Sequence, residues 1–160
     1  MRLKRKSPRM TSWGIGPKFA FASLAVGVII ILVNGFVFPP LILRFSPFTF
    51  FPGVILILLG ITLCVIAAVQ VHRAFDQGKL ITEGVYAYVR NPVYAAWVLL
   101  IVPGLVLVTG FLLMTVMPFI MYFLIRTLVV EEDEYLEKKF GKEYLEYKKT
   151  VNSIIPKLTI

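Results

Sequence analysis

The side chains that could carry out chemistry are gathered in two short polar stretches of an otherwise apolar chain. The first, residues 78–94, reads GKLITEGVYAYVRNPVY and ends in Asn91-Pro92 where an apolar run begins. Proline suits the first helical position and asparagine can cap free backbone amides, so a helix is predicted to begin at Asn91. The free amides of a helix start, with the positive end of the helix dipole behind them, favour a carboxylate or phosphate group. An ordinary loop with a well-capped exit is the alternative interpretation.

The second polar stretch begins with two carboxylates, Glu131 and Glu132, where the last apolar run ends. A carboxylate at the edge of a bilayer is costly to desolvate without a cationic partner, and Arg90, Arg126 or a bound cation could supply one. His72 is the single histidine, so no metal site is predicted. The sequence has no glycine-rich phosphate loop and no CxxC pair, so a cofactor would have to be bound by loops and helix ends at the membrane face.

The composition indicates that lipid is the solvent for much of the surface. Hydrophobic residues make up 58% of the 160 residues, and the mean hydropathy is +0.82. Residues 19–43, 45–72 and 91–125 contain no Lys, Arg, Asp or Glu. A hydrocarbon core needs about 20 helical residues to cross, so the first two runs are predicted to cross once each. The third run is too long for a single crossing, so it must fold back on itself.

The predicted fold is therefore that of an all-α membrane protein with four transmembrane helices. The first two crossings are expected at about residues 19–38 and 53–71, and a tight helical hairpin is expected at residues 92–128. Two dipeptides near the middle of the hairpin, Pro-Gly at 103–104 and Thr-Gly at 109–110, mark the region where its turn is required.

Four crossings place both termini on one side of the membrane. Residues 1–18 carry six basic residues and no acid, and Arg44 alone of the 17 Lys and Arg residues would lie on the other side. The positive-inside rule then predicts cytoplasmic termini, in the cell (inner) membrane. The N-terminal run is interpreted as an uncleaved anchor rather than a cleaved signal peptide, because it is long and no small-x-small site follows it. The single domain, 1–160, divides into a basic N-terminus (1–18), two crossings (19–72), a central loop (73–91), the hairpin (92–128) and a cytoplasmic C-terminal segment (129–160).

The C-terminal segment is predicted to be an amphipathic helix that lies along the membrane or against the central loop. Apolar and aromatic side chains recur there at spacings of four, four, three and four, which places them on one helix face. They are Leu136, Phe140, Tyr144, Tyr147 and Val151. Gly141 is expected to divide the segment into two short pieces. The same stripe would suit a small, non-enzymatic membrane adaptor that docks a partner protein.

Two blocks of residues resemble the integral-membrane methyltransferases that include isoprenylcysteine carboxyl methyltransferases and, more distantly, phospholipid N-methyltransferases. Residues 84–94, GVYAYVRNPVY, are similar to the G-x-Y-x-x-x-R-H/N-P-x-Y signature of that family. Glu131-Glu132 and the residues that follow, to Pro156, are similar to its E-E-x-x-x-L-x-x-x-F-G-x-x-Y-x-x-Y pattern and closing proline. Asn91 stands where many members have histidine, and Arg126 is offset from an arginine that contacts the acceptor in some members.

This resemblance implies a cytoplasmic pocket for S-adenosylmethionine, which would leave as S-adenosylhomocysteine. The residues implied for cofactor binding are Gln70, Gly78, Lys79, Leu80, Ile81, Tyr86, Asn91, Pro92, Val93, Tyr94 and Glu132. Arg126 and Glu131 are candidates for positioning the methyl acceptor. The implied reaction is direct methyl transfer to a lipophilic acceptor at the membrane, most like isoprenylcysteine carboxyl O-methylation, without a general base. The alternative enzyme is a phospholipid N-methyltransferase of the phosphatidylethanolamine type, and neither a metal nor a nucleic acid is implied.

Overall fold

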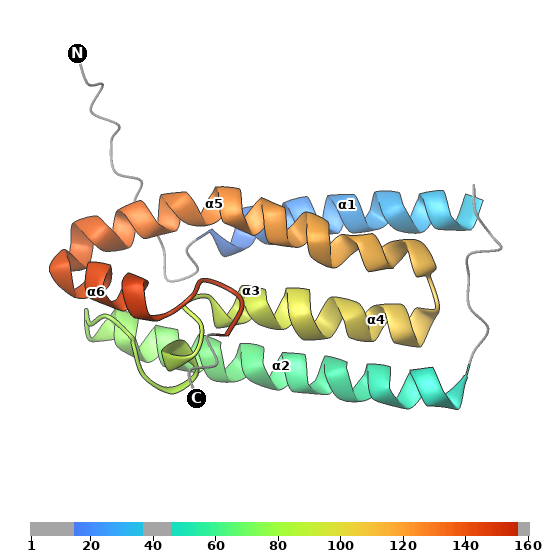
Figure 1. Ribbon diagram of the computed structural model, residues 1–160, viewed down its shortest axis with the longest axis horizontal. Helices are drawn as coiled ribbons and strands as arrows, with labels where there is room; N and C mark the ends of the chain where they lie inside the picture. Colours follow the sequence, from blue (N-terminus) through green and yellow to red (C-terminus); the bar gives the residue numbers. More distant parts are fainter. Residues whose placement is uncertain (1–14, 37–45, 157–160) are drawn as a thin grey trace, which may run out of the picture.

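The computed structural model describes residues 15–36 and 46–156, which are mostly helical (Figure 1). Four stretches in these ranges are long and apolar enough to cross a membrane. They are Gly16–Phe36, Pro47–Ala74, Pro92–Thr109 and Leu112–Phe140. The prediction of an all-α membrane protein with four transmembrane helices is therefore confirmed. Most of the predicted basic N-terminus, and Arg44, lie outside the described residues.

The elements follow one another in a simple order along the chain. The three long helices are α1 (Gly16–Phe36), α2 (Pro47–Asp76) and α5 (Met117–Phe140). The third crossing is assembled from α3 (Pro92–Ala96), a π-helical turn η3 (Trp97–Ile101) and α4 (Val102–Thr109). Short 3-10 turns form η2 (Gly84–Ala87) and η4 (Leu112–Val116), and α6 (Lys142–Thr150) follows α5. The loop at residues 77–91, which contains η2, therefore joins α2 to the third crossing.

The third crossing is the centre of the bundle. Half of its apolar stretch is buried, compared with 11% of the stretches in the first and second crossings. Gly53 of α2 and Gly104 of α4 let these two backbones touch, since a Cβ added at Gly104 would lie 2.7 Å from the Gly53 carbonyl oxygen. The two helices accordingly run side by side in Figure 1. Outward-facing side chains remain apolar, with Phe21 77% and Phe48 90% exposed, as a surface in contact with lipid requires.

Of the two predicted turn sites in the hairpin, the chain uses the second. Gly110 adopts the left-handed conformation, with a φ of 71°, and ends α4. Pro103 and Gly104 lie inside the third crossing instead. Proline lacks an N–H group, and the π turn just before Pro103 widens the helix so that the N–H of Val102 bonds to the carbonyl of Trp97.

Two helices continue beyond their predicted ends and build the site. α2 runs from Pro47 to Asp76, so it is longer than the predicted crossing at both ends. α5 continues through the acidic residues to Phe140, because no glycine or proline interrupts the chain after Pro118 until Gly141, whose φ is 57°. The predicted break at Gly141 is present, but the first piece is the end of the fourth crossing rather than a separate surface helix.

The start of α1 and the C-terminal residues 151–156 lie at the same end of the bundle (Figure 1). An ion pair between Lys18 and Glu131 connects the first turns of α1 to α5 at this end. Ile15 and Phe19 are buried in the same core cluster as Ile125 of α5. The described ends of the chain thus meet beside the central loop.

Candidate functional site

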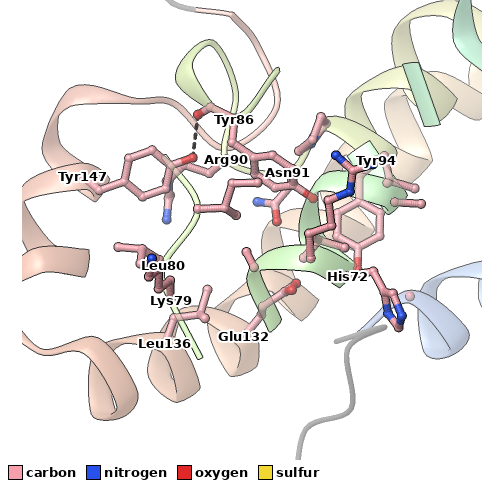
Figure 2. A pocket seen from close by; sticks show the side chains of 18 of the residues that line it. His72, Lys79, Leu80, Tyr86, Arg90, Asn91, Tyr94, Glu132, Leu136 and Tyr147 are labelled. Carbon is pink, nitrogen blue, oxygen red and sulfur yellow. Dashed lines mark hydrogen bonds between the residues drawn. The ribbon is translucent and has the colours of Figure 1, made fainter. Parts of the chain in front are cut away.

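A cavity of about 700 Å³ lies at this end of the bundle. Its walls come from the end of α2, the central loop, the start of the third crossing, and the facing sides of α5 and α6. Figure 2 shows side chains from these elements around the cavity, with Glu132 on one side and Asn91 on the other. Most of the predicted cofactor-binding residues line it. They are Lys79, Leu80, Ile81, Tyr86, Asn91, Pro92, Val93, Tyr94 and Glu132.

Two of the predicted cofactor residues shape the central loop and do not line the cavity. Gly78 has a φ of 65°, so it supplies a left-handed turn just after α2. Gln70 lies beneath the loop, where its Oε1 accepts a hydrogen bond from the N–H of Val85 over 3.4 Å. Gly84, with a φ of 62°, packs directly on the Gln70 amide. A glutamine that bonds to the loop backbone in this way supports the cavity wall from outside.

Asn91 precedes a helix, as predicted, but its side chain does not cap that helix. α3 begins at Pro92, and the Asn91 side chain makes no hydrogen bond to the first turn. Its Nδ2 instead donates to Ser153 Oγ over 2.9 Å, and its backbone N–H donates to the Ser153 carbonyl over 3.0 Å. The C-terminal residues therefore hold the turn that the sequence predicts to contact a ligand.

Two buried tyrosines join α6 to the central loop. The hydroxyl of Tyr147 donates to the carbonyl of Tyr86 over 2.6 Å, and the hydroxyl of Tyr86 donates to the carbonyl of Ala67 over 3.4 Å. Burial raises the pKa of both hydroxyls, and the negative charge of Glu132 raises that of Tyr86 further. Both tyrosines therefore stay protonated and act as hydrogen-bond donors.

Glu132 lines the cavity from α5, and one of its carboxylate oxygens is buried. Its Oε2 is inaccessible to solvent and has no hydrogen-bond partner among the described residues. Arg90, one of the predicted cationic partners of the acidic pair, is taken by Asp133, with 2.8 Å between Nη1 and Oδ1. A desolvated carboxylate oxygen without a donor is costly, so it marks a place where a ligand donor or cation would be favourable.

The two residues predicted to position the acceptor, Glu131 and Arg126, do not line the cavity. Glu131 points to the start of α1, where it pairs with Lys18. Arg126 is exposed on α5 and does not line the cavity. Successive helical residues point about 100° apart, so of the adjacent acids Glu131 and Glu132 only the second faces the cavity.

Several lining residues were not among the predicted site residues. They are His72, Arg73, Arg90, Tyr135, Leu136, Lys139, Phe140, Tyr144 and Tyr147, with Gly16 of α1 and small or apolar residues of α2. The signal for four of them, Leu136, Phe140, Tyr144 and Tyr147, was the amphipathic stripe of the C-terminal segment. Most of that stripe faces inward: Tyr144 is 2% and Tyr147 8% exposed. A membrane adaptor would need these side chains on the surface to dock a partner protein. Tyr144 and Tyr147 are buried, so they cannot form such a docking surface.

The cavity has a cationic rim and an apolar wall. Arg73, Lys79 and Lys139 come from three different elements, line the cavity and are exposed. The apolar wall includes Val69 of α2 and Trp97 of η3, which belong to membrane-crossing stretches and are 43% and 41% exposed. The arrangement can therefore bring together a charged small molecule and an apolar one.

Comparisons with known proteins point to one enzyme family. Two rice proteins, from Oryza sativa subspecies indica and japonica, are each described as a probable protein-S-isoprenylcysteine O-methyltransferase. Each is 26% identical to this chain over 95% of the chain and 83% of the relative. A protein-S-isoprenylcysteine O-methyltransferase from Dictyostelium discoideum is 32% identical over 51% of the chain and 34% of its own length. No solved structure gives a significant match.

A family model gives the firmest assignment. The model that describes the isoprenylcysteine carboxyl methyltransferase family matches residues 53–138, more than half of the chain. That range contains most of α2, the central loop, the third crossing and most of α5, which together form most of the cavity wall. The protein is thus an enzyme, a membrane methyltransferase, and the chain belongs to the isoprenylcysteine carboxyl methyltransferase family.

Proposed function

We propose that the protein transfers a methyl group from S-adenosylmethionine to the carboxylate of a lipophilic acceptor, most like an S-prenylated cysteine, at the cytoplasmic face of the membrane. Family membership supports the reaction class, and the names of the relatives in rice and Dictyostelium support the acceptor class. The cavity supports a location of the reaction at the membrane face, because its lining combines a polar end with an apolar wall from the membrane-crossing helices.

The observation that carries the proposal is the unpartnered carboxylate oxygen of Glu132. S-adenosylmethionine carries a sulfonium and an ammonium group, so a buried anion in the cavity fits it. A volume of about 700 Å³ is within the range of small-molecule sites. When bound, this cofactor supplies a methyl group that is already activated, and an ionised carboxylate can accept it without a general base.

The residues that would hold the cofactor come from facing walls of the cavity. Tyr86 and the turn from Asn91 to Tyr94 form one wall, and Lys79, Leu80 and Ile81 extend it along the central loop. Glu132 faces this wall from α5. The tyrosine ring of Tyr94 packs against Phe19 of α1, with ring centroids 5.1 Å apart, so its position is fixed by the core. Rigid walls of this kind align two reactants and exclude water, which is what direct methyl transfer requires.

The charge of the rim favours a carboxylate acceptor over an amine. Arg73, Lys79 and Lys139 would attract an anionic acceptor toward the cavity and repel a protonated amine. This is the specific reason to prefer O-methylation to N-methylation of a phospholipid. The apolar part of the acceptor would lie against Val69 and Trp97.

The sidedness of the membrane is part of the same proposal. The cavity and the described ends of the chain lie at one end of the bundle. In the sequence, six of the first 18 residues, which lead into α1, are basic. The positive-inside rule places such a cluster in the cytoplasm, where S-adenosylmethionine is made. Both termini would then be cytoplasmic, in the cell (inner) membrane.

Isothermal titration of the detergent-solubilised protein with S-adenosylhomocysteine tests the cofactor. Binding to the wild type is expected, with weaker binding to Glu132→Gln, which keeps the shape of the side chain and removes its charge. Glu134→Gln is the matched control, because Glu134 is exposed on the same helix and does not line the cavity. Absence of heat with the wild type would rule the cofactor out.

A second experiment tests the acceptor. Membranes that contain the protein are incubated with a methyl-labelled donor and a small S-prenylated cysteine, and the product is treated with base. A carboxyl ester releases the label as volatile methanol, whereas an N-methylated lipid retains it. Retention of all transferred label would replace the carboxylate with an amine as the acceptor.

A further inference from the structure

Asp133 is a buried carboxylate that takes no direct part in the cavity wall. It is 8% exposed and follows Glu132 on α5. Its Oδ1 lies 2.8 Å from Arg90 Nη1 and accepts a hydrogen bond from the hydroxyl of Tyr144, and its Oδ2 lies 2.9 Å from Lys148 Nζ. Two helices and the central loop therefore meet on one side chain.

Arg90 extends this cluster to the C-terminal residues. Its Nε donates to the carbonyl of Val151 over 3.1 Å, and its backbone N–H donates to the carbonyl of Asn152 over 2.8 Å. The next residue, Asn91, bonds to Ser153 through both backbone and side chain. Arg90 is thus the residue where the central loop, α5, α6 and the C-terminal residues are fastened together.

The positions of the two partners in the chain connect the cluster to the cavity. Arg90 immediately precedes Asn91, which lines one wall, and Asp133 immediately follows Glu132, which lines the facing wall. Arg90 itself lines the cavity beside Asn91, whereas Asp133 does not, so the ion pair holds one polar wall to the other from behind Glu132. Its side chains are 10% and 12% exposed, so solvent screens it little.

The pair also determines which carboxylate holds the guanidinium. Arg90 pairs with Asp133, and Glu132 Oε2 has no hydrogen-bond partner among the described residues. If Asp133 lost its charge, the guanidinium would remain buried without its counter-ion, and the nearby acid Glu132 would become its favoured partner. A cationic ligand group would then have lost its site.

We propose that Asp133 is a positioning residue for the methyl donor: it acts through Arg90 to fix the Asn91 turn opposite Glu132 and to keep Glu132 free. The inference rests on the proposed function. It concerns a residue that touches no ligand, so its removal should weaken the donor site without removing any group from the cavity wall.

The test is titration of the detergent-solubilised protein with S-adenosylhomocysteine. Asp133→Asn is expected to raise Kd by about tenfold to a hundredfold, by analogy with the residues that orient metal ligands from behind. Asp133→Glu restores the carboxylate and is expected to bind about tenfold more tightly than Asp133→Asn. Lys148→Met is the matched control, because the side chain of Lys148 is 35% exposed and pairs with Asp133 and Glu137, both on α5. The Kd of this variant should stay within about twofold of the wild type.

A double variant, Arg90→Met with Asp133→Leu, keeps the test decisive if the single variant does not fold. Replacing both members of a buried ion pair by apolar residues often preserves stability. Its thermal unfolding should therefore resemble that of the wild type. Its Kd should rise, because the guanidinium of Arg90 leaves the cavity wall and its bonds to Val151 and Tyr144 are gone. If this variant or Asp133→Asn bound S-adenosylhomocysteine with the wild-type Kd, the role of Asp133 would be overturned and the proposed function would stand. Absence of binding to the wild type would overturn the proposed function and this inference with it.

Discussion

The hydroxyl of Tyr147 donates a hydrogen bond to the backbone carbonyl of Tyr86 over 2.6 Å, and this contact joins the last helix to the central loop. Both residues line the cavity, and both are buried. α6 makes no membrane crossing, so contacts of this kind decide where it lies. The cavity therefore depends on a helix that is packed by hydrogen bonds and aromatic rings rather than held by the bilayer.

Tyr147→Phe should destabilise the protein and weaken donor binding together. The substitution leaves the carbonyl of Tyr86 without its donor, which costs about 1–3 kcal/mol when the group is buried. Thermal unfolding in detergent and titration with S-adenosylhomocysteine measure the two effects. Tyr88→Phe is the control, because Tyr88 lies in the same loop but is 65% exposed. Equal behaviour of the two variants would mean that the contact does not hold α6 in place.

Gly84→Ala should be more damaging than Gly78→Ala. Both glycines have a positive φ, so alanine costs about 1–2 kcal/mol of backbone strain at either position. At Gly84 the added Cβ would also collide with the amide of Gln70, whereas nothing lies within 4 Å of it at Gly78. Comparison of the two melting temperatures isolates the collision.

A second variant identifies the residue responsible. Gln70→Ala in the Gly84→Ala background removes the obstructing amide and should recover part of the lost stability. If the double variant recovered no stability, the loss in Gly84→Ala would come from backbone strain at this position and not from the collision with Gln70.

Lys18→Met should have little effect on stability. The ion pair of Lys18 with Glu131 lies at the surface, with side chains 62% and 47% exposed, so it is worth about 0–1 kcal/mol. Raising the salt concentration should change the melting temperature of the wild type and the variant equally. A large loss would mean that the start of α1 depends on this pair and not on the burial of Ile15 and Phe19.

The crossings and much of the candidate site could be predicted because their signals are local. Charge-free runs determine where the chain is solvated by lipid, and Asn91-Pro92 predicts a helix start from two adjacent residues. Glu132 was identified from its position after an apolar run and a family pattern. Each of these features depends on residues that are near one another in the sequence.

The residues that the sequence did not reveal depend on contacts between distant segments. In the sequence, Asp133 is one acid in a charged run. It becomes buried because α6 folds back after Gly141 and brings Tyr144 and Lys148 to it. Gln70 was expected at the cavity wall, but a backbone N–H fifteen residues later takes its oxygen. Periodicity shows which face of a helix is polar, but it does not show what that face will meet.

Trp97→Ala should impair use of the acceptor and spare the donor. Trp97 lines the cavity from the π turn of the third crossing and is 41% exposed, so its ring offers apolar area to an acceptor chain. Loss of part of that area should raise KM for a small S-prenylated cysteine about tenfold, while Kd for S-adenosylhomocysteine stays within about twofold. Phe119→Ala is the control, because Phe119 is 68% exposed on α5 and does not line the cavity. If Trp97→Ala instead weakened donor binding and left the acceptor KM unchanged, the apolar wall would belong to the donor, and the acceptor would have to approach from another side.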